Sequence, residues 1–433
     1  MKKVKIALLG LGNVGKGVLS IIRENKEQIV KRSGYEVEIA KILVRDKDKD
    51  RGIEIPSEIL TTNYDDILND DDIKIVVEVM GGIDPAKEYI IRAMEAKKQI
   101  VTANKMLLAT CGDEVFEKAD EMGVSFQYEA SVAGGIPIIN GINESLTANK
   151  INTLYGIVNG TTNYILSKME LENLNFEDVL KEAQDKGYAE ADPTSDIEGY
   201  DAQYKLVILS SLAFGTKIKP ENVYREGITK INSIDMEYAS SFGMVIKLLA
   251  IAKEENGELE LRVHPTMIPE THPLANVYDS FNAVFINGNA VGDMMFYGRG
   301  AGSLPTGSAV VSDIISILRN NVEVENMQPV VKNNLWEMKI KDLKDVESRY
   351  YLRITVSDKP GVLGQITTIF GANKVSLKSV IQKGVKQEEN IDVTLVLITH
   401  STTEGLIIDS IDRLYDLKTV KSIDNIIRIE DFK

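Results

Sequence analysis

The sequence predicts an α/β protein in three parts: a doubly wound parallel sheet, a mixed α+β region and a small ferredoxin-like module. Three observations support this prediction. Strand-like and helical patterns alternate up to about residue 135, and longer helical stretches mixed with strands follow. The last stretch, about 349–433, has the order strand, helix, strand, strand, helix, strand. A chain of 433 residues is long enough for two or three domains, each with its own core.

The first part, residues 1–135, alternates short apolar runs with amphipathic stretches. Strands that are joined by crossover helices lie parallel in one sheet, so this alternation predicts a doubly wound sheet. The expected strands are 4–10, 36–44, 73–82 and 124–130, with helical patterns at 14–32 and within 86–105.

The middle part, residues 136–300, is predicted to form an α+β domain. Helices are expected at 136–150, 176–188, 202–215 and 241–255, and strands at 258–268 and 282–298. A glycine-rich loop then leads into another helix, and we expect residues 300–320 to return to the first part. The polar, poorly periodic segment 321–348 is predicted to be a linker to the module at 349–433.

The composition excludes several classes of function. Fifty lysines and arginines against 65 acidic residues give a net charge of −15 without a long basic block, which argues against a nucleic-acid or membrane partner. The single cysteine, Cys111, rules out an intramolecular disulfide. The basic, apolar N-terminus is interrupted by glycines, and no run reaches the ~18–20 apolar residues of a membrane span. We therefore expect a soluble, cytoplasmic protein.

A glycine motif follows the first predicted strand directly and opens a helix. Its first glycine suits a tight turn, its second lets a pyrophosphate approach the backbone, and its third allows close packing of helix and strand. The N-terminus of the helix then faces the anion. The sequence therefore predicts a Rossmann-type dinucleotide-binding domain, with these residues at the cofactor: Gly10, Gly12, Asn13, Val14 and Gly15.

The second predicted strand ends at LVRDKDKDR, where Rossmann domains place the residue that reads the ribose. Arg45 comes first there, and its guanidinium matches a 2′-phosphate, which favours NADP over NAD. Asp46 beside it fits NAD instead, and Arg45 as a solvated loop residue is the other interpretation.

The stretch EADPTSDIEGYDAQYK, residues 190–205, contains five carboxylates and one lysine. Such runs usually form a solvated surface. Proline and glycine indicate a loop up to residue 199, and a helix is expected to begin near Gly199 or Tyr200. On this helix Asp201 and Lys205 are four residues apart and share a face. The helix becomes apolar directly after Lys205, which predicts a buried lysine with a carboxylate partner or a catalytic task.

A buried lysine beside a nicotinamide has a defined task. Hydride reduction of a carbonyl places negative charge on oxygen, and an ammonium group stabilises and protonates that oxygen. We therefore predict that Lys205 is the proton donor and that Asp201 supports it. Glu190 and Asp196 are predicted to bind an ammonium group of the substrate.

Five segments together resemble homoserine dehydrogenase in order and spacing: VTANK (101–105), YEASVAGGIPII (128–139), GIVNGTTNYIL (156–166), GYAEADPTSDIEGYDAQYKL (187–206) and GRGAGSLPTGSAVVSD (298–313). The resemblance extends over roughly the first 320 residues. It implies the NAD(P)H-dependent, reversible reduction of L-aspartate 4-semialdehyde to L-homoserine, on the route to threonine, methionine and isoleucine.

The resemblance also implies roles for individual residues. Lys205 matches the proton donor of the family, Asp201 supports it, and Glu190 and Asp196 contact the substrate. Ala191 is a mild departure, because relatives often have proline there. The implied residues beside the cofactor are Lys105, at the nicotinamide, and Thr102, Asn104, Ser131, Gly302 and Thr306.

The family has a structural monovalent cation, such as Na⁺, near the start of its second domain. One carboxylate and backbone carbonyls bind it, and oxygen ligands of this kind suit a hard cation. The matching positions are Glu129, Val132, Gly134 and Ile136.

DKPGVLGQI, residues 358–366, resembles the turn of an ACT domain, a regulatory module that pairs across chains and binds an amino acid. The resemblance implies an effector site at Gly361, Val362 and Leu363, threonine as inhibitor, and a homodimer or homotetramer. Alternatively, the module serves oligomerisation only. No kinase-sized segment precedes residue 1, so we expect a monofunctional enzyme.

Two other functions fit parts of the sequence. One is a different dehydrogenase with Rossmann and ACT domains, acting on a hydroxy acid or prephenate, but no motif places a catalytic histidine. The other is a non-catalytic sensor of nucleotide and amino acid, which has no need of Glu190, Asp201 and Lys205.

Overall fold

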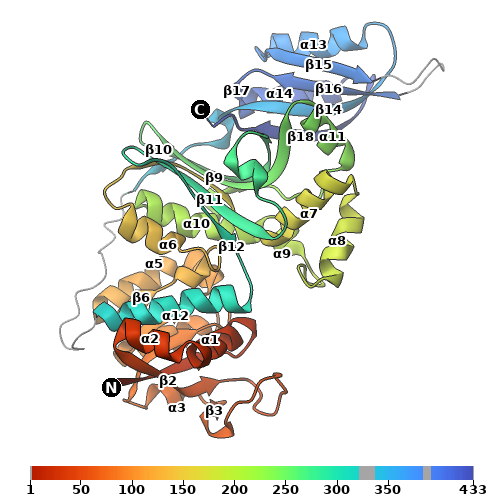
Figure 1. The fold of residues 1–433 in the computed structure, drawn as a ribbon. Helices are drawn as coiled ribbons and strands as arrows, with labels where there is room; N and C mark the ends of the chain where they lie inside the picture. The colour runs from red at the N-terminus through yellow and green to blue at the C-terminus, as the bar shows by residue number, and fades with distance from the viewer. Residues whose placement is uncertain (1, 321–336, 384–391, 433) are drawn as a thin grey trace. The chain divides into compact units, whose positions relative to one another are not determined.

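The computed structural model describes residues 2–320, 337–383 and 392–432 (Figure 1). The chain divides into two compact units. The first unit comprises residues 1–154, 203–222 and 281–338, and the second comprises 155–202, 223–280 and 339–433. Most of the predicted linker, residues 321–336, lies outside the described residues. Among the helices that are described, none has the length and apolar character needed to cross a membrane.

A six-stranded parallel sheet forms the centre of the first unit, in the order β3-β2-β1-β4-β5-β6. This is the predicted doubly wound sheet. The strand order reverses at β1, and the carboxyl ends of the strands beside such a reversal form the usual ligand-binding edge. The strands are β1 (Lys2–Leu9), β2 (Tyr35–Leu43), β3 (Leu60–Thr61), β4 (Ile73–Glu78), β5 (Gln99–Thr102) and β6 (Phe126–Gln127).

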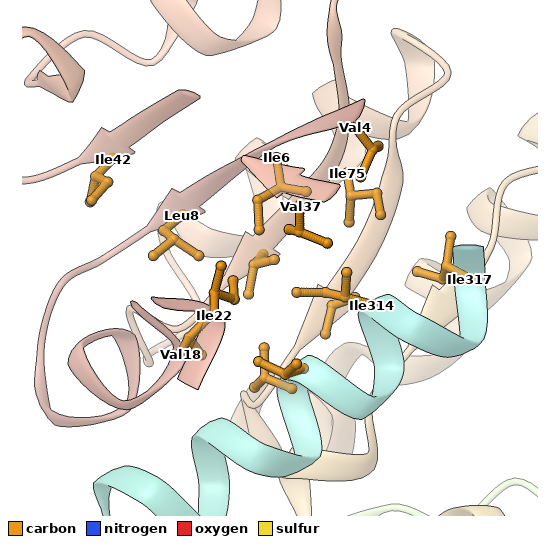
Figure 2. Close-up of a cluster of buried hydrophobic side chains, with 14 of the residues drawn as sticks. Val4, Ile6, Leu8, Val18, Ile22, Val37, Ile42, Ile75, Ile314 and Ile317 are labelled. Atoms are coloured by element: carbon orange, nitrogen blue, oxygen red, sulfur yellow. The ribbon is translucent and has the colours of Figure 1, made fainter. Parts of the chain in front are cut away.

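Helices from both ends of the first unit's sequence cover this sheet. Figure 2 shows the core on one face, where Ile6 of β1, Ile22 of α1 and Ile314 of α12 belong to one cluster of buried side chains. The helix α12 therefore packs on the N-terminal sheet although about 300 residues separate it from β1 in sequence. The helices are α1 (Asn13–Glu24), α2 (Lys26–Ser33), α3 (Asp65–Leu68), α4 (Ala86–Glu95), α5 (Lys105–Met122) and α12 (Ser303–Asn320).

Glycines allow α1 and α12 to approach closely. A Cβ atom added at Gly17 would lie 2.0 Å from the carbonyl oxygen of Ser303, and one added at Gly307 would lie 2.7 Å from the carbonyl carbon of Gly17. We expect Gly17→Ala to lower the free energy of unfolding by about 1–3 kcal/mol, because the added methyl group overpacks a closed contact. Urea unfolding followed by circular dichroism measures this change.

Gly371→Ala is the matched control for that prediction. Gly371 also lies in a helix, α13 (Val362–Ala372), but apart from that helix's own backbone no atom of the described residues lies within 4 Å of an added Cβ. This substitution should leave stability unchanged or raise it by up to about 1 kcal/mol, because alanine favours the helix. Equal losses of stability in the two variants would contradict the packing argument.

The rest of the first unit contains less regular structure than expected. The predicted helix at 136–150 is reduced to α6 (Ile138–Asn140) and a π-helical turn at Gly141–Ser145, and the strand β7 (Ile151–Ile157) follows. The strands β11 (Phe281–Gly288) and β12 (Gly292–Arg299) form an antiparallel hairpin in the region predicted to be strand.

An extended sheet in the second unit has the order β9-β10-β18-β14-β16-β15. The strands β9 (Met244–Glu255) and β10 (Glu258–Pro269) pair antiparallel over their whole length. Our expectation of a helix at 241–255 is therefore wrong. The segment MVIKLLAIAKEE is apolar over most of its length, which fits a buried strand as well as a buried helix. Pairing with β10 overrides the helix propensity of its leucines and alanines.

The helices of the second unit include two that pack on β9 of this sheet (Figure 1). Those outside the C-terminal module are α7 (Gly160–Glu172), α8 (Phe176–Asp185), α9 (Thr194–Ile197), α11 (Ser233–Ser241) and the start of α10 (Tyr200–Phe214), whose remainder belongs to the first unit. The expected start of α10 near Tyr200 is confirmed. The loop predicted up to residue 199 contains the short helix α9, which the sequence analysis missed.

The C-terminal module has the predicted βαββαβ order. Its helices α13 and α14 contact each other and contribute to one apolar core with the strands, in which Phe370 and Leu352 are completely buried. The parallel pairing of β18 with β10 joins the module to the strands of the second unit. The elements of the module are β14 (Glu347–Ser357), α13, β15 (Leu377–Lys383), β16 (Asp392–Thr399), the short β17 (Thr402–Thr403), α14 (Glu404–Tyr415) and β18 (Val420–Ile429). Outside the module, the short strands β8 (Tyr224–Arg225) and β13 (Lys339–Ile340) pair with β10.

Candidate active site

The glycine motif forms the turn between β1 and α1. Gly10 has a φ of +103°, a backbone conformation that favours glycine. A Cβ at Gly15 would lie 2.6 Å from the carbonyl oxygen of Gly10, so this position admits no side chain. At Gly12, in contrast, no described atom outside the neighbouring backbone lies within 4 Å of an added Cβ. The open space and the first N–H groups of α1, which includes Asn13 and Val14, fit a pyrophosphate.

Arg45 lies two residues after the end of β2 and is exposed. Its place at the carboxyl end of a strand beside β1 is the place of the ribose-reading residue in a Rossmann fold. The guanidinium is therefore available to a ligand at this edge.

A buried carboxylate supports the loop that follows β4, and the sequence analysis did not identify it. Glu78, at the end of β4, accepts hydrogen bonds from the backbone N–H groups of Met80 (2.8 Å) and Gly81 (3.1 Å). Its other oxygen accepts a hydrogen bond from the hydroxyl of Thr102 at 2.6 Å. The only signal in the sequence is an acidic residue at the end of a mostly apolar strand.

Asn104 and Lys105 begin the helix α5. The Asn104 side chain accepts a hydrogen bond from the N–H of Leu107 (3.1 Å) and donates one to the carbonyl of Gly82 (2.6 Å). Lys105, the first residue of α5, is partly buried. The predicted residues Thr102, Asn104 and Lys105 thus lie together at the carboxyl end of β5.

The remaining predicted cofactor residues come from two other segments of the first unit. Ser131 is buried and donates its hydroxyl to the carbonyl of Tyr128 at 2.6 Å. Gly302 has a φ of +122° and precedes α12, and Thr306 is buried in the first turns of that helix.

The predicted cation residues surround a buried carboxylate. The two oxygens of Glu129 accept hydrogen bonds from the N–H groups of Ile139 (2.8 Å) and Asn140 (2.7 Å). Gly134 has a φ of +51°, and an added Cβ there would lie 2.5 Å from the carbonyl oxygen of Gly300. Val132 and Ile136 are buried in the same turn.

Asp313 of α12 is a second buried carboxylate at this place, and sequence reasoning missed it. One of its oxygens accepts the N–H of Glu129 at 2.9 Å. Among the described residues, no hydrogen-bond donor reaches its other oxygen, Oδ1. Burial raises the pKa of Asp313 well above its usual range, and the neighbouring Glu129 raises it further. Burial also raises the pKa of Glu129 against the effect of its backbone donors. Two buried carboxylates that disfavour their ionised forms fit a bound cation.

The acidic stretch 190–201 divides into residues with different surroundings. Asp192 accepts hydrogen bonds from the backbone (3.1 Å) and hydroxyl (2.6 Å) of Thr194, and these bonds lower the pKa of Asp192. Asp192 therefore stabilises the start of α9 through its hydrogen bonds to Thr194. Glu190 is exposed, Asp196 is partly buried and Asp201 is buried, with 3% of its surface exposed.

One asparagine brings two of the predicted site residues together. The amide nitrogen of Asn159 donates to Oδ1 of Asp196 at 2.7 Å and to Oδ2 of Asp201 at 2.8 Å. Asn159 was missed by the sequence analysis, although it lies in the quoted segment GIVNGTTNYIL directly before a helix, where asparagine is a common cap.

Asp201 and Lys205 are both buried on one face of α10. Their exposed fractions are 3% and 7%. A lysine with so little exposure on a helix that continues with four buried aliphatic residues, 206–209, is rare without a specific role. Asp201 and Lys205 thus lie about one helical turn apart along α10.

The first unit contains a cavity of about 610 Å³ that does not coincide with the predicted site. Side chains of α5 and α10, including Phe116 and Leu212, line it, but none of the predicted site residues does.

In the C-terminal module, the predicted effector residues lie at the start of α13. Gly361 has a φ of +90° and is the N-cap residue of α13, Val362 is buried, and Leu363 is 40% exposed.

Comparison with known proteins identifies the family. Residues 137–315 match the family "Homoserine dehydrogenase", residues 10–129 match "Homoserine dehydrogenase, NAD binding domain", and residues 350–414 match "ACT domain". The homoserine dehydrogenase of Bacillus subtilis is 41% identical, and that of Neisseria gonorrhoeae is 44% identical, each with 99% of both chains covered.

Solved structures agree with this result. A homoserine dehydrogenase from Thiobacillus denitrificans is 43% identical, with a TM-score of 0.93 and coverage of 100% of this chain and 99% of that chain. A hyperthermophilic archaeal homoserine dehydrogenase in complex with NADPH is 29% identical, with a TM-score of 0.62 and coverage of 73% of this chain and 97% of that chain. The fold, the NAD(P)-binding domain and these relatives show that the chain belongs to the homoserine dehydrogenase family, the oxidoreductases that act on the CH–OH group of homoserine.

Proposed function

We propose that the chain reduces L-aspartate 4-semialdehyde to L-homoserine with Lys205 as the proton donor. The observation that supports this assignment is the burial of Lys205 one helical turn after the buried carboxylate of Asp201. The ammonium group stabilises the negative charge that develops on the aldehyde oxygen and then transfers a proton to it. Asp201 favours the charged form of Lys205 until that transfer.

The substrate also has an α-ammonium group. We assign its binding to Glu190 and Asp196, two carboxylates of the segment that leads into α10. Fixing this end of the substrate positions the aldehyde for reaction, and Lys105 at the start of α5 contributes on the nicotinamide side.

The cofactor NAD(P)H supplies the hydride when it is bound. The residues that would bind it are the glycine turn, Asn13 and Val14, the Thr102–Lys105 loop, Ser131, Gly302 and Thr306. The NADPH complex of the archaeal relative supports NADP as the preferred cofactor. The exposed guanidinium of Arg45 at the carboxyl end of β2 supports the same choice.

Replacement of Arg45 by alanine tests this preference. We expect the ratio of kcat/KM for NADPH to that for NADH to fall by about tenfold or more, because a charge-assisted bond to the 2′-phosphate is lost. Arg51→Ala is the control, since Arg51 is also a loop arginine and donates to the carbonyl groups of Lys49 and Asp46. An unchanged ratio in Arg45→Ala would refute the role of Arg45 in cofactor choice.

A monovalent cation such as Na⁺ has a structural role in this proposal. Glu129 and Asp313 supply carboxylate oxygens near the turn of Val132, Gly134 and Ile136, whose carbonyls are the remaining ligands. The unpartnered Oδ1 of Asp313 and the raised pKa values of both carboxylates support it.

Regulation by threonine through the ACT module is the last part of the proposal, together with assembly as a homodimer or homotetramer. A series of contacts supports communication between the module and the acidic stretch. Arg428 of β18 donates to Glu404 of α14 (2.8 Å) and to Glu226 (3.0 Å). Arg225, next to Glu226, donates to the carbonyl of Glu198.

We expect threonine to lower activity and to raise the melting temperature of the full chain. Glu226→Gln should weaken the inhibition about fivefold or more while the Kd of threonine stays constant, because a typical coupling energy is about 1–3 kcal/mol. Steady-state kinetics and calorimetric titration measure the two quantities. If threonine changes neither activity nor melting temperature, the module serves oligomerisation instead.

A further inference from the structure

The amide of Asn159 has a fixed orientation at the start of α7. Asn159 follows β7 and caps α7, and its Oδ1 accepts hydrogen bonds from the N–H (2.8 Å) and the hydroxyl (2.9 Å) of Thr162. A backbone N–H can only donate, so the oxygen of the amide must face Thr162. Its NH₂ group therefore points the opposite way.

The two hydrogens of that NH₂ group go to two different carboxylates. One hydrogen bond reaches Asp196 of α9 at 2.7 Å, and the other reaches Asp201 in the first turn of α10 at 2.8 Å. Asn159 is 5% exposed, so water competes little for these bonds. A single neutral group thus bridges the two carboxylates.

Only an amide has this combination of groups. The position requires one acceptor for the helix cap and two donors for the carboxylates, and asparagine is the side chain of this length that offers both. Aspartate would keep the cap but would add a third negative charge beside Asp196 and Asp201.

The start of α7 is itself held firmly. A Cβ at Gly160 would lie 2.7 Å from the carbonyl oxygen of Ser280, so the helix lies directly against that backbone. The hydroxyl of Thr161 donates to the carbonyl of Tyr188 at 2.7 Å, just before the acidic stretch. The first residues of α7 therefore contact both ends of the segment that leads into α10.

We propose that Asn159 is a positioning residue of the reaction. Its amide holds the substrate-binding Asp196 and the lysine-supporting Asp201 at the spacing that the substrate and Lys205 require. The inference rests on the proposed function, because it depends on the roles given there to these two carboxylates.

Asn159→Ser tests this role. Serine is a good helix cap, so α7 should persist, but a hydroxyl cannot reach both carboxylates. We expect kcat to fall and the KM for L-aspartate 4-semialdehyde to rise, each by about tenfold or more, because both carboxylates lose their fixed positions. The Kd of NADPH should stay constant. Asn159→Asp keeps the cap and the size of the side chain, and should lose more activity than Asn159→Ser because of charge repulsion.

Two comparisons separate positioning from a purely structural effect. Asn232→Ser makes the same change at the cap of α11, outside the acidic stretch, and should leave kcat and KM unchanged. In an Asp201→Asn background, which removes the carboxylate that supports Lys205, Asn159→Ser should change kcat about twofold at most, because its effect on kcat passes through Asp201. The KM should still rise, because the contact of Asn159 with Asp196 is lost in either background. Independent, multiplicative losses of kcat in this cycle would overturn the inference, as would normal kcat and KM in Asn159→Ser.

The wild-type chain in the same assay distinguishes failure of the inference from failure of the proposed function. Absence of wild-type turnover with NADPH or NADH would refute the proposed function. In that case the cycle is measured by urea unfolding. Coupled effects of Asn159→Ser and Asp201→Asn on the free energy of unfolding would support the positioning of Asp201 by Asn159, and additive effects would overturn it.

Discussion

Replacement of Lys205 by alanine should lower kcat by about 10²–10⁴-fold, the usual contribution of a general acid. The variant loses both the proton donor and the positive charge beside the developing oxyanion. The Kd of NADPH should change little, because the glycine turn and the loops after β4 and β5 form the proposed cofactor site. Oxidation of NADPH with L-aspartate 4-semialdehyde, followed by absorbance, measures kcat, and fluorescence titration measures the Kd.

Lys217→Ala is the matched control for this experiment. Lys217 follows the same helix, but its side chain is 47% exposed and forms a surface ion pair with Glu117 at 3.0 Å. Its loss should leave kcat unchanged, because exposed pairs contribute little. Lys205→Arg adds a second comparison, since arginine keeps the charge but does not release its proton. A normal kcat in Lys205→Ala would remove the proton-donor role.

Replacement of Asp235 by alanine should lower the free energy of unfolding by about 3–5 kcal/mol, the cost of leaving a buried charge without its partner. Asp235 of α11 is fully buried. It accepts hydrogen bonds from Tyr351 (3.0 Å), from Arg353 (2.8 Å) and from Asn425 (2.8 Å). These donors lie on β14 and β18, so one carboxylate connects α11 with the ACT strands.

Urea unfolding of Asp235→Ala and Asp424→Ala tests this prediction. Asp424 lies 3.5 Å from the same guanidinium of Arg353, but 19% of its side chain is exposed. Water can therefore replace it in part, and we expect a loss of about 1 kcal/mol or less. Similar losses of unfolding free energy in both variants would contradict the prediction that the buried hydrogen bonds of Asp235 stabilise the second unit more than the partly exposed Asp424 does.

The candidate site was only partly predictable. The burial of Asp201 and Lys205 on one helix follows from the apolar pattern of a short segment, and the structure confirms it. Asn159 was not recognised, because its hydrogen bond to Asp196 joins residues 37 positions apart. The contact between Glu129 and Asp313 joins residues 184 positions apart, and no local pattern indicates it.

The sequence by itself determined the doubly wound sheet, the glycine turn, the start of α10, the ACT order and the family. These features depend on local interactions, which repeat within a turn of helix or along a strand and so leave a periodic or spaced pattern. Only the tertiary structure decided that residues 244–255 form a strand, that Glu78 supports Thr102, and that one amide joins Asp196 and Asp201. Those outcomes depend on which buried partners meet after folding, because an apolar run or a buried polar group takes the structure that satisfies its hydrogen bonds.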